Sequence, residues 1–326
     1  MAIKSVSALV LDGLAIFEFG VICEVFGIDR SADGVPNFDF KVCGPQPGTP
    51  LRTSVGATII PDHGLDDLVG ADLVAIPAIG GSEFCPEALE AVRAAAESGS
   101  IILTVCSGAF VAGAAGLLDG RPCTTHWMHA DELARMYPTA KVDRNVLYVD
   151  DGNLITSAGT AAGIDACLHL VRRELGSEVT NKIARRMVVP PQRDGGQRQY
   201  IDQPIPVRCS EGFAPHLDWV LSNLDKPLTV ATLARRVNMS PRTFARRFVE
   251  ETGRTPMQWV TDQRVLFARR LLEETDLDVD RIAERSGFGT ATLLRHHFRR
   301  MIGVTPSDYR RRFACGGPCE ETAATA

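Results

Sequence analysis

The chain has 326 residues, of which 45% are hydrophobic and 23% are charged, so it is long enough for two domains with ordinary apolar cores. Its longest apolar run spans about ten residues, too few to cross a bilayer, and we expect no signal peptide because the first residues lack an apolar core. Nine scattered cysteines without a CxxC pair argue against a disulfide framework and a zinc site. We therefore expect a cytoplasmic protein with reduced thiols, no bound metal and no membrane attachment.

Short apolar runs and helical patterns alternate along the first half of the chain. The runs predict strands at 6–11, 39–43, 73–77, 101–105 and 154–157. The helical patterns fall at 19–28, 87–98, 109–117, 128–136 and 162–174. This alternation predicts an α/β fold with a mostly parallel sheet covered by helices on both faces. Because there is no GxGxxG motif and no P-loop, we expect no nucleotide and no other cofactor.

The sharpest local feature is a cysteine that follows a strand of buried character. The segment Ile101-Ile-Leu-Thr-Val-Cys106-Ser107-Gly108 brings Cys106 into a tight turn of small residues just before a predicted helix. This is the geometry of a nucleophile elbow, and a helix N-terminus favours the thiolate form of a cysteine. A small buried residue after a strand would give the same pattern.

Other residues are candidates for a ligand pocket around this cysteine. Glu18 follows the first strand at the carboxyl edge of the sheet, where α/β proteins bind ligands. A carboxyl beside a thiolate would stay protonated and donate a hydrogen bond to the sulfur. His126 comes soon after the elbow helix, and Gly80 and Gly81 could offer backbone amides as in an oxyanion hole. The histidine could equally be structural, and the glycines could simply form a turn. The candidate pocket comprises Glu18, Gly80, Gly81, Cys106, Ser107 and His126.

Residues 5–196 resemble the PfpI-type branch of the class I glutamine-amidotransferase-like proteins. The matching segments are Cys106-Ser-Gly-Ala, Gly116-Leu-Leu-Asp-Gly120, Thr125-His-Trp127, Thr156-Ser-Ala-Gly-Thr-Ala-Ala-Gly-Ile-Asp165 and Gly195-Gly-Gln197. The resemblance implies a flavodoxin-like sheet and extends to isocyanide hydratases and, more closely, to the ligand-sensing halves of DNA-binding regulators. Proteases of this superfamily carry a histidine directly after the cysteine, where this chain has Ser107. We therefore expect a small-molecule sensor without catalytic residues.

A broken, proline-rich stretch and a change of charge separate the two halves. We predict one domain at 1–196, a linker at 197–212, a second domain at 213–313 and a disordered tail at 314–326. Residues 214–313 have a net charge of +6, whereas the rest of the chain has a net charge of −11. A basic domain suggests a polyanionic partner, although a solvated helical surface would also explain the charge.

The second domain contains an internal repeat. Segment 240–256 aligns with 290–306, so that a phenylalanine, a glycine, a threonine and a proline recur at a spacing of 50 residues. Each copy starts at a hydroxyl residue suited to N-cap a helix, ends at a glycine suited to C-cap it, and follows a short amphipathic helix. These are two helix-turn-helix units, joined by one helix over 256–274 that is about 28 Å long. Because one DNA turn is ~34 Å, both second helices could enter successive major grooves. A helical solenoid is the other interpretation of such a repeat.

Residues 213–313 resemble the AraC/XylS family of transcription regulators. The signature includes Ile282-Ala-Glu-Arg-Ser-Gly-Phe-Gly289 and Gly303-Val-Thr-Pro-Ser-Asp-Tyr-Arg310. By position, the recognition helices would present to DNA Arg242, Thr243, Arg246 and Arg247 in the first unit and Thr290, Thr292, Arg295, His296 and Arg299 in the second. Arginines can bind guanine or hold phosphates, whereas Phe244, Phe248, Leu294 and Phe298 are expected in the core.

The sequence thus predicts a sequence-specific DNA-binding transcription regulator. The resemblance implies promoter DNA as the partner, a homodimer, an unidentified small-molecule effector and, for an activator as is usual in the family, RNA polymerase. The alternative is a cysteine-dependent enzyme of the isocyanide hydratase type with an attached DNA-binding domain.

Overall fold

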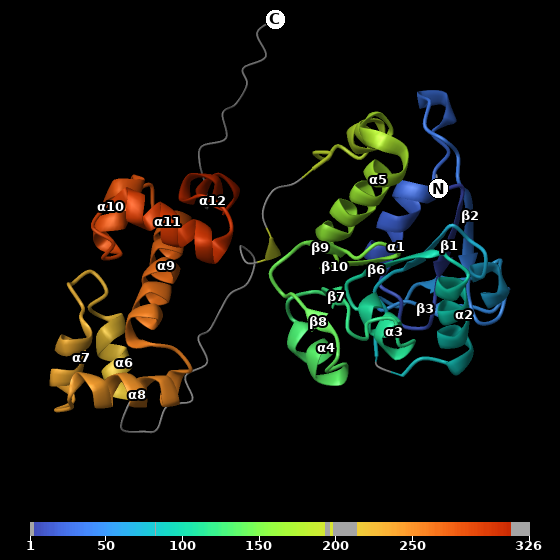
Figure 1. Cartoon of the computed structure of the whole chain (residues 1–326). Helices are drawn as coiled ribbons and strands as arrows, with labels where there is room; N and C mark the ends of the chain where they lie inside the picture. Colours follow the sequence, from blue (N-terminus) through green and yellow to red (C-terminus); the bar gives the residue numbers. More distant parts are fainter. Residues whose placement is uncertain (1–2, 82, 193–195, 198–213, 314–326) are drawn as a thin grey trace, which may run out of the picture. The chain divides into compact units, whose positions relative to one another are not determined.

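The computed structural model describes residues 3–81, 83–192, 196–197 and 214–313, and the chain forms two compact units (Figure 1). The first unit is Met1–Gln197 and the second is Arg198–Ala326. The predicted linker, apart from Gln197, and the predicted tail lie outside the described residues. Within the described ranges, no helix combines the length and the apolar character needed to cross a membrane.

The first unit is built on a six-stranded sheet. The strand order is β2 (Asp39–Cys43), β1 (Ser5–Leu9), β5 (Leu73–Ile76), β6 (Ile101–Val105), β10 (Leu154–Ser157) and β9 (Tyr148–Asp150). Neighbouring strands are parallel except for β9, which pairs antiparallel with β10. The predicted mostly parallel sheet is therefore confirmed, and the edge strand β9 is an addition to the predicted strands.

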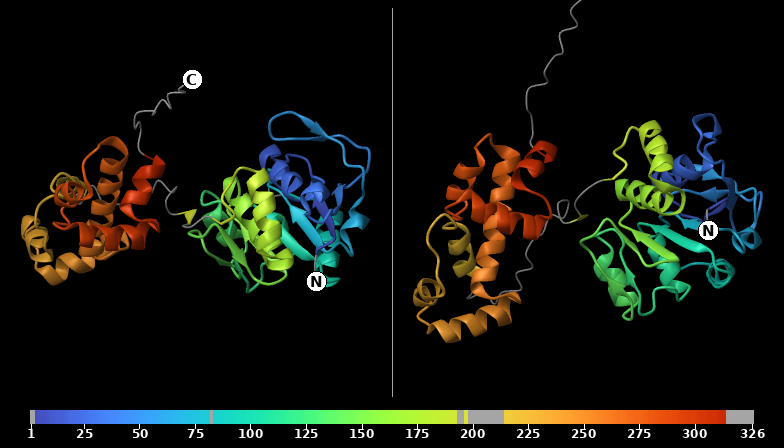
Figure 2. Two further views of the ribbon diagram at one scale, coloured as in Figure 1. Left: turned by 90° about the horizontal axis from the view of Figure 1, so that it is seen from above. Right: turned by 45° about the horizontal axis from the view of Figure 1, so that its top comes forward.

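Helices cover both faces of this sheet (Figures 1 and 2). One face is covered by α1 (Ile16–Ile22), which continues as a π-helix over Cys23–Gly27, and by α5 (Ala161–Arg186). The other face is covered by α2 (Pro86–Glu97), α3 (Gly108–Ala114) and α4 (Ala130–Met136). The side chains of β5 alternate between the two cores, with Leu73 and Ala75 under α1 and α5 and with Val74 and Ile76 under α2 and α3.

Smaller elements complete the first unit. A hairpin forms from β3 (Leu51–Arg52) and β4 (Thr58–Ile59), and a parallel pair forms from β7 (Pro122–Cys123) and β8 (Lys141–Val142). Short 3-10 turns lie at Ser31–Asp33 and Leu65–Leu68. The sequence does not predict the two-residue strands, because two residues are too few to show an alternation. Helix α5 is longer than predicted and is interrupted at Gly176, which has φ +86°.

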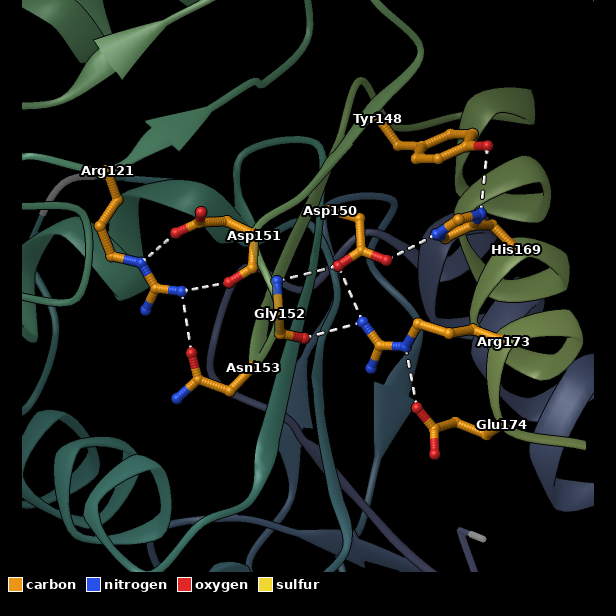
Figure 3. A network of polar contacts seen from close by, with 9 residues as sticks. All are labelled: Arg121, Tyr148, Asp150, Asp151, Gly152, Asn153, His169, Arg173 and Glu174. Atoms are coloured by element: carbon orange, nitrogen blue, oxygen red, sulfur yellow. Dashed lines mark hydrogen bonds and ion pairs between the residues drawn. The ribbon is translucent and has the colours of Figure 1, made fainter. Parts of the chain in front are cut away.

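A polar network fixes the edge strand β9 and the turn that leads into β10 (Figure 3). A carboxylate oxygen of Asp150 lies 2.7 Å from Nε2 of His169, and Arg173 donates to the other oxygen at 2.8 Å. Arg121, just before β7, donates to Asp151 and Asn153 in the turn. The network therefore binds β9 to α5 and holds the segment around β7 beside the sheet.

The second unit is entirely helical in its described part. Its helices are α6 (Ala214–Leu221), α7 (Val230–Arg236), α8 (Pro241–Thr252), α9 (Pro256–Glu274), α10 (Val279–Arg285), α11 (Ala291–Ile302) and α12 (Pro306–Phe313). One core lies among α6, α7 and α8, and another lies among α10, α11 and α12. Helix α9 contributes Trp259 and Val260 to the first core and Val265 and Ala268 to the second. It is the single long helix that the sequence predicts, with the same bounds.

Local capping explains where the second helices of the repeat begin and end. Ser240 accepts a hydrogen bond from the Thr243 amide at 3.2 Å, and Thr290 accepts one from the Leu293 amide at 3.3 Å. Gly253 and Gly303 end the helices in the left-handed region, with φ of +71° and +92°. The predicted N-caps and C-caps are confirmed, because such signals act within a few residues of the chain.

Candidate functional site

The sharp turn predicted at Cys106 is present at the carboxyl end of β6. Cys106 has φ +56°, a backbone conformation that residues other than glycine rarely adopt. Its amide donates to the Ser157 carbonyl at 3.0 Å, and its own carbonyl accepts from the Thr125 hydroxyl at 2.7 Å. A Cβ at Gly108 would lie 2.4 Å from the Ile76 carbonyl oxygen, so the start of α3 requires glycine. Neighbours from β5, β10 and the segment that follows β7 thus hold the cysteine in an elbow.

Two elements from distant parts of the sequence close on the cysteine. Glu18 of α1 is 5% exposed, and its carboxylate accepts from the Thr160 amide at 3.3 Å. Thr160 follows β10 with φ +45°. A Cβ at Gly159 would lie 2.1 Å from the Cβ of Cys106, so the turn after β10 packs directly on the cysteine. Residue-by-residue reasoning missed Gly159 and Thr160, although small residues between a strand and a helix were a signal for them.

The charge of Glu18 acts on the thiol. Burial raises the pKa of Cys106 to about 11, with Glu18 as a further cause, and a hydrogen bond from the Ser107 backbone only partly opposes them. The thiol is therefore protonated at neutral pH. Burial and Glu18 thus act against the thiolate form, in the direction opposite to the expected effect of the helix N-terminus.

The remaining predicted pocket residues have different surroundings. The Ser107 hydroxyl accepts from the Ile79 amide at 3.1 Å and donates to the Ile79 carbonyl at 2.9 Å, so it ties the loop after β5 to the elbow. The Gly80 amide donates to the Gly13 carbonyl at 3.0 Å. Gly80 is therefore occupied within the fold and does not offer its amide to a ligand. Gly81 has φ +89°. Of the two glycines predicted to offer a backbone amide to a ligand, Gly81 is therefore the one that remains a candidate.

His126 lies close enough to Glu18 for their charges to interact. Burial is the main cause that lowers the pKa of His126, His129 lowers it further, and Glu18 opposes the shift. Its Nδ1 atom accepts from the Met128 amide at 3.3 Å. Among the described residues, no hydrogen bond joins His126 to Cys106, so Glu18 is the group that interacts electrostatically with both.

The second helix of the first helix-turn-helix unit, α8, exposes most of its predicted DNA-contacting residues. Arg242 is exposed, and the Arg246 side chain is 77% exposed and lies 3.7 Å from Glu250. The Thr243 hydroxyl lies 2.9 Å from the hydroxyl of the N-cap residue, so it takes part in the cap. Arg247 is partly buried and lies 3.9 Å from Glu251. The predicted core residues Phe244 and Phe248 are fully buried.

Helix α11 presents its predicted residues on one face. Thr292, Arg295, His296 and Arg299 are all exposed, at the i, i+3, i+4 and i+7 positions that share a helix face. Thr290 is exposed and N-caps the helix. The opposite face carries Leu294 and Phe298, which are fully buried as predicted.

The second unit contains two helix-turn-helix units that one helix joins. The second helix of each carries exposed arginines, and this arrangement is typical of DNA-binding proteins. Residues 233–312 match the family described as a helix-turn-helix domain, and residues 4–173 match the DJ-1/PfpI family. The chain belongs to the DJ-1/PfpI family and carries an AraC-type helix-turn-helix domain. Both predicted resemblances are confirmed.

Three named proteins are similar to this chain over different shares of its length. The HTH-type transcriptional regulator GbdR of Pseudomonas aeruginosa is 26% identical over 97% of this chain and 86% of its own length. An HTH-type transcriptional regulator of Mycobacterium tuberculosis is 32% identical over 70% of this chain and 89% of its own length. An isonitrile hydratase of Pseudomonas putida is 32% identical over 44% of this chain and 62% of its own length. The chain is a DNA-binding transcription regulator, as its sequence predicts.

Proposed function

We propose that this regulator reads promoter DNA with the exposed faces of α8 and α11 and binds a small-molecule effector beside Cys106. The observation that carries the DNA part is the exposure of arginines on two capped helices that α9 holds in one unit. Arg242 lies in the first turn of α8 and Arg295 at the start of the second turn of α11, near the helix N-termini from which side chains reach base edges. Arg246 and Arg299 follow one turn later and would contact bases or phosphates. The remaining candidates, Thr243, Arg247, Thr290, Thr292 and His296, would complete the interface.

The effector site would lie at the carboxyl edge of the parallel sheet, where α/β proteins bind ligands. Cys106, Glu18, Thr160 and Gly81 follow different strands or begin the helices after them. His126 would add a neutral imidazole, since its pKa is lowered mainly by burial. A protonated thiol is a poor nucleophile, which favours binding over catalysis.

A homodimer would fit the exposed apolar side chains of the first unit. Ile16 and Phe17 at the start of α1 are 39% and 55% exposed, and an apolar surface of this kind marks an interaction site. Two chains would bring four recognition helices to repeated half-sites. We further propose that the protein is cytoplasmic and activates transcription through contact with RNA polymerase.

Selection of genomic DNA by the full-length protein at about 150 mM salt tests the proposal, because nonspecific phosphate binding is weak there. We expect a few promoters with half-sites about one helical turn apart. If no sequence is enriched, with or without added cell extract, the proposed function is wrong.

An enzyme of the isonitrile hydratase type is the second candidate function, favoured by the elbow geometry at Cys106. The full-length protein should then hydrate an isonitrile, and Cys106→Ala should abolish turnover. We expect no turnover, because the thiol is held in its neutral form.

A further inference from the structure

Gln197 is the last residue of the first unit, and the chain that leads to the second unit follows it directly. Its side chain is only 3% exposed. The side-chain oxygen accepts from the Trp127 amide at 2.7 Å, and the side-chain nitrogen donates to the carbonyls of Thr125 at 2.9 Å and Val146 at 3.0 Å. Its backbone amide donates to the Asn145 carbonyl at 2.8 Å. A domain end usually frays, whereas this one is held by a buried, satisfied amide.

The backbone beside Gln197 is also fitted to this position. A Cβ at Gly196 would lie 2.1 Å from the Asn145 carbonyl oxygen, so only glycine allows the chain to approach so closely. The side-chain nitrogen also lies 3.3 Å from the Thr124 hydroxyl. Both polar atoms of the Gln197 side chain are therefore bonded to the short segment 124–127, and the nitrogen is also bonded to the Val146 carbonyl, which lies between β8 and β9.

The same segment is bonded to the Cys106 elbow. The Thr125 hydroxyl donates to the Cys106 carbonyl at 2.7 Å, and the Thr124 amide donates to the Thr156 hydroxyl of β10 at 2.8 Å. His126 lies between Thr125, whose hydroxyl contacts the elbow, and Trp127, whose amide contacts Gln197. A displacement of the elbow or of His126 would therefore move the very groups that hold Gln197.

We propose that Gln197 is a positioning residue that couples the state of the Cys106 site to the chain leading to the DNA-binding unit. The inference rests on the proposed function, in which an effector binds at that site. A ligand that shifts the Thr125 carbonyl or the Trp127 amide weakens the hold on Gln197 and frees the start of the interdomain chain. The coupling is reciprocal, so that release of Gln197 loosens the elbow.

Limited trypsin digestion of the full-length protein measures this hold, because Arg198 directly follows Gln197 and Arg208 provides a second cleavage site in the same chain. Gln197→Ala should raise cleavage after Arg198, relative to Arg208, by at least about tenfold, because the three side-chain hydrogen bonds that it loses together exceed the free energy of a tenfold change. Thr125→Val removes the hydroxyl that contacts the elbow and should raise the same ratio several-fold. Gln46→Ala and Thr139→Val are the controls, an exposed glutamine and a threonine whose hydroxyl donates to Asp119.

Hydrogen exchange of peptides covering the elbow gives the reciprocal measurement. Gln197→Glu keeps the acceptor for the Trp127 amide but puts a carboxylate oxygen where the donor to two carbonyls was, so the melting temperature should fall. Exchange should rise more in the elbow than in the rest of the first unit. Thr125→Ser, which keeps the hydroxyl, should restore the wild-type cleavage ratio.

Two results would overturn the coupling. One is a wild-type cleavage ratio in Thr125→Val, and the other is a uniform rise of exchange over the whole first unit in Gln197→Glu, which would indicate a merely structural role. Neither depends on DNA. If the coupling fails while the wild-type protein still selects promoter sequences, the proposed function stands. If no sequence is selected, the proposed function fails whatever the cleavage ratio shows.

Discussion

Replacing Arg246 by alanine tests whether the exposed face of α8 contacts DNA. The side chain is 77% exposed and lies 3.7 Å from Glu250, one turn further along the helix. Exposed pairs at this spacing contribute about 0.3–0.5 kcal/mol, and alanine is a good helix former. The free energy of unfolding should therefore change by less than about 0.5 kcal/mol, so that any loss of DNA binding reports on the interface.

DNA binding should respond much more strongly than stability. If Arg246 contacts a guanine, the loss of about 1–3 kcal/mol raises the Kd for the selected operator about 5- to 150-fold and relaxes the sequence preference. If it contacts only a phosphate, affinity falls for every sequence, and the slope of log K against log salt becomes shallower by about 0.9.

Fluorescence anisotropy with an operator duplex and a scrambled duplex, over a range of salt concentrations, distinguishes these cases. The matched control is Arg135→Ala, since Arg135 is 76% exposed and lies 4.0 Å from Glu132 in a helix of the first unit. An unchanged Kd and salt slope in Arg246→Ala would refute the assignment. So would an equal loss in the control, which would indicate a mere effect of net charge.

Three further predictions follow from the caps, the elbow and its charge. Ser240→Ala and Thr290→Ala should each lower the free energy of unfolding by about 1 kcal/mol in urea titrations, because each removes an N-cap bond; no change would mean that the caps are unimportant. Gly159→Ala should be far more destabilising than Gly152→Ala, since both have a positive φ but only the first would place a Cβ against the elbow; equal losses would contradict the packing described. Glu18→Gln removes a negative charge that raises the pKa of the elbow thiol, so the pH midpoint of its alkylation by iodoacetamide should fall from about 11. A rise of this midpoint would show instead that a protonated Glu18 donates a hydrogen bond to the sulfur.

Local signals in the sequence determined many of the helix and strand positions in this protein. The sequence predicted the bounds of α9, and it predicted the N-cap residues and the terminal glycines of α8 and α11. Each of these features depends on residues within one or two turns of the helix. The alternation of strands and helices predicted the parallel sheet for the same reason. The exposed and buried faces of α11 followed from the helical period alone, and the exposed face carries four of the nine predicted DNA-contacting residues.

Tertiary structure decided the chemistry of the candidate effector site. Glu18 and Thr160 meet although 142 residues separate them, and the Gly80 amide is occupied by a carbonyl from another loop. Burial and a carboxyl group from a distant part of the sequence both raise the pKa of the Cys106 thiol. From the sequence, Gln197 ends a segment that resembles the PfpI-type proteins and starts the predicted linker, whereas the fold buries it among groups some 50 to 70 residues away. Contacts between distant segments exist only after the chain has folded, so no local pattern encodes them.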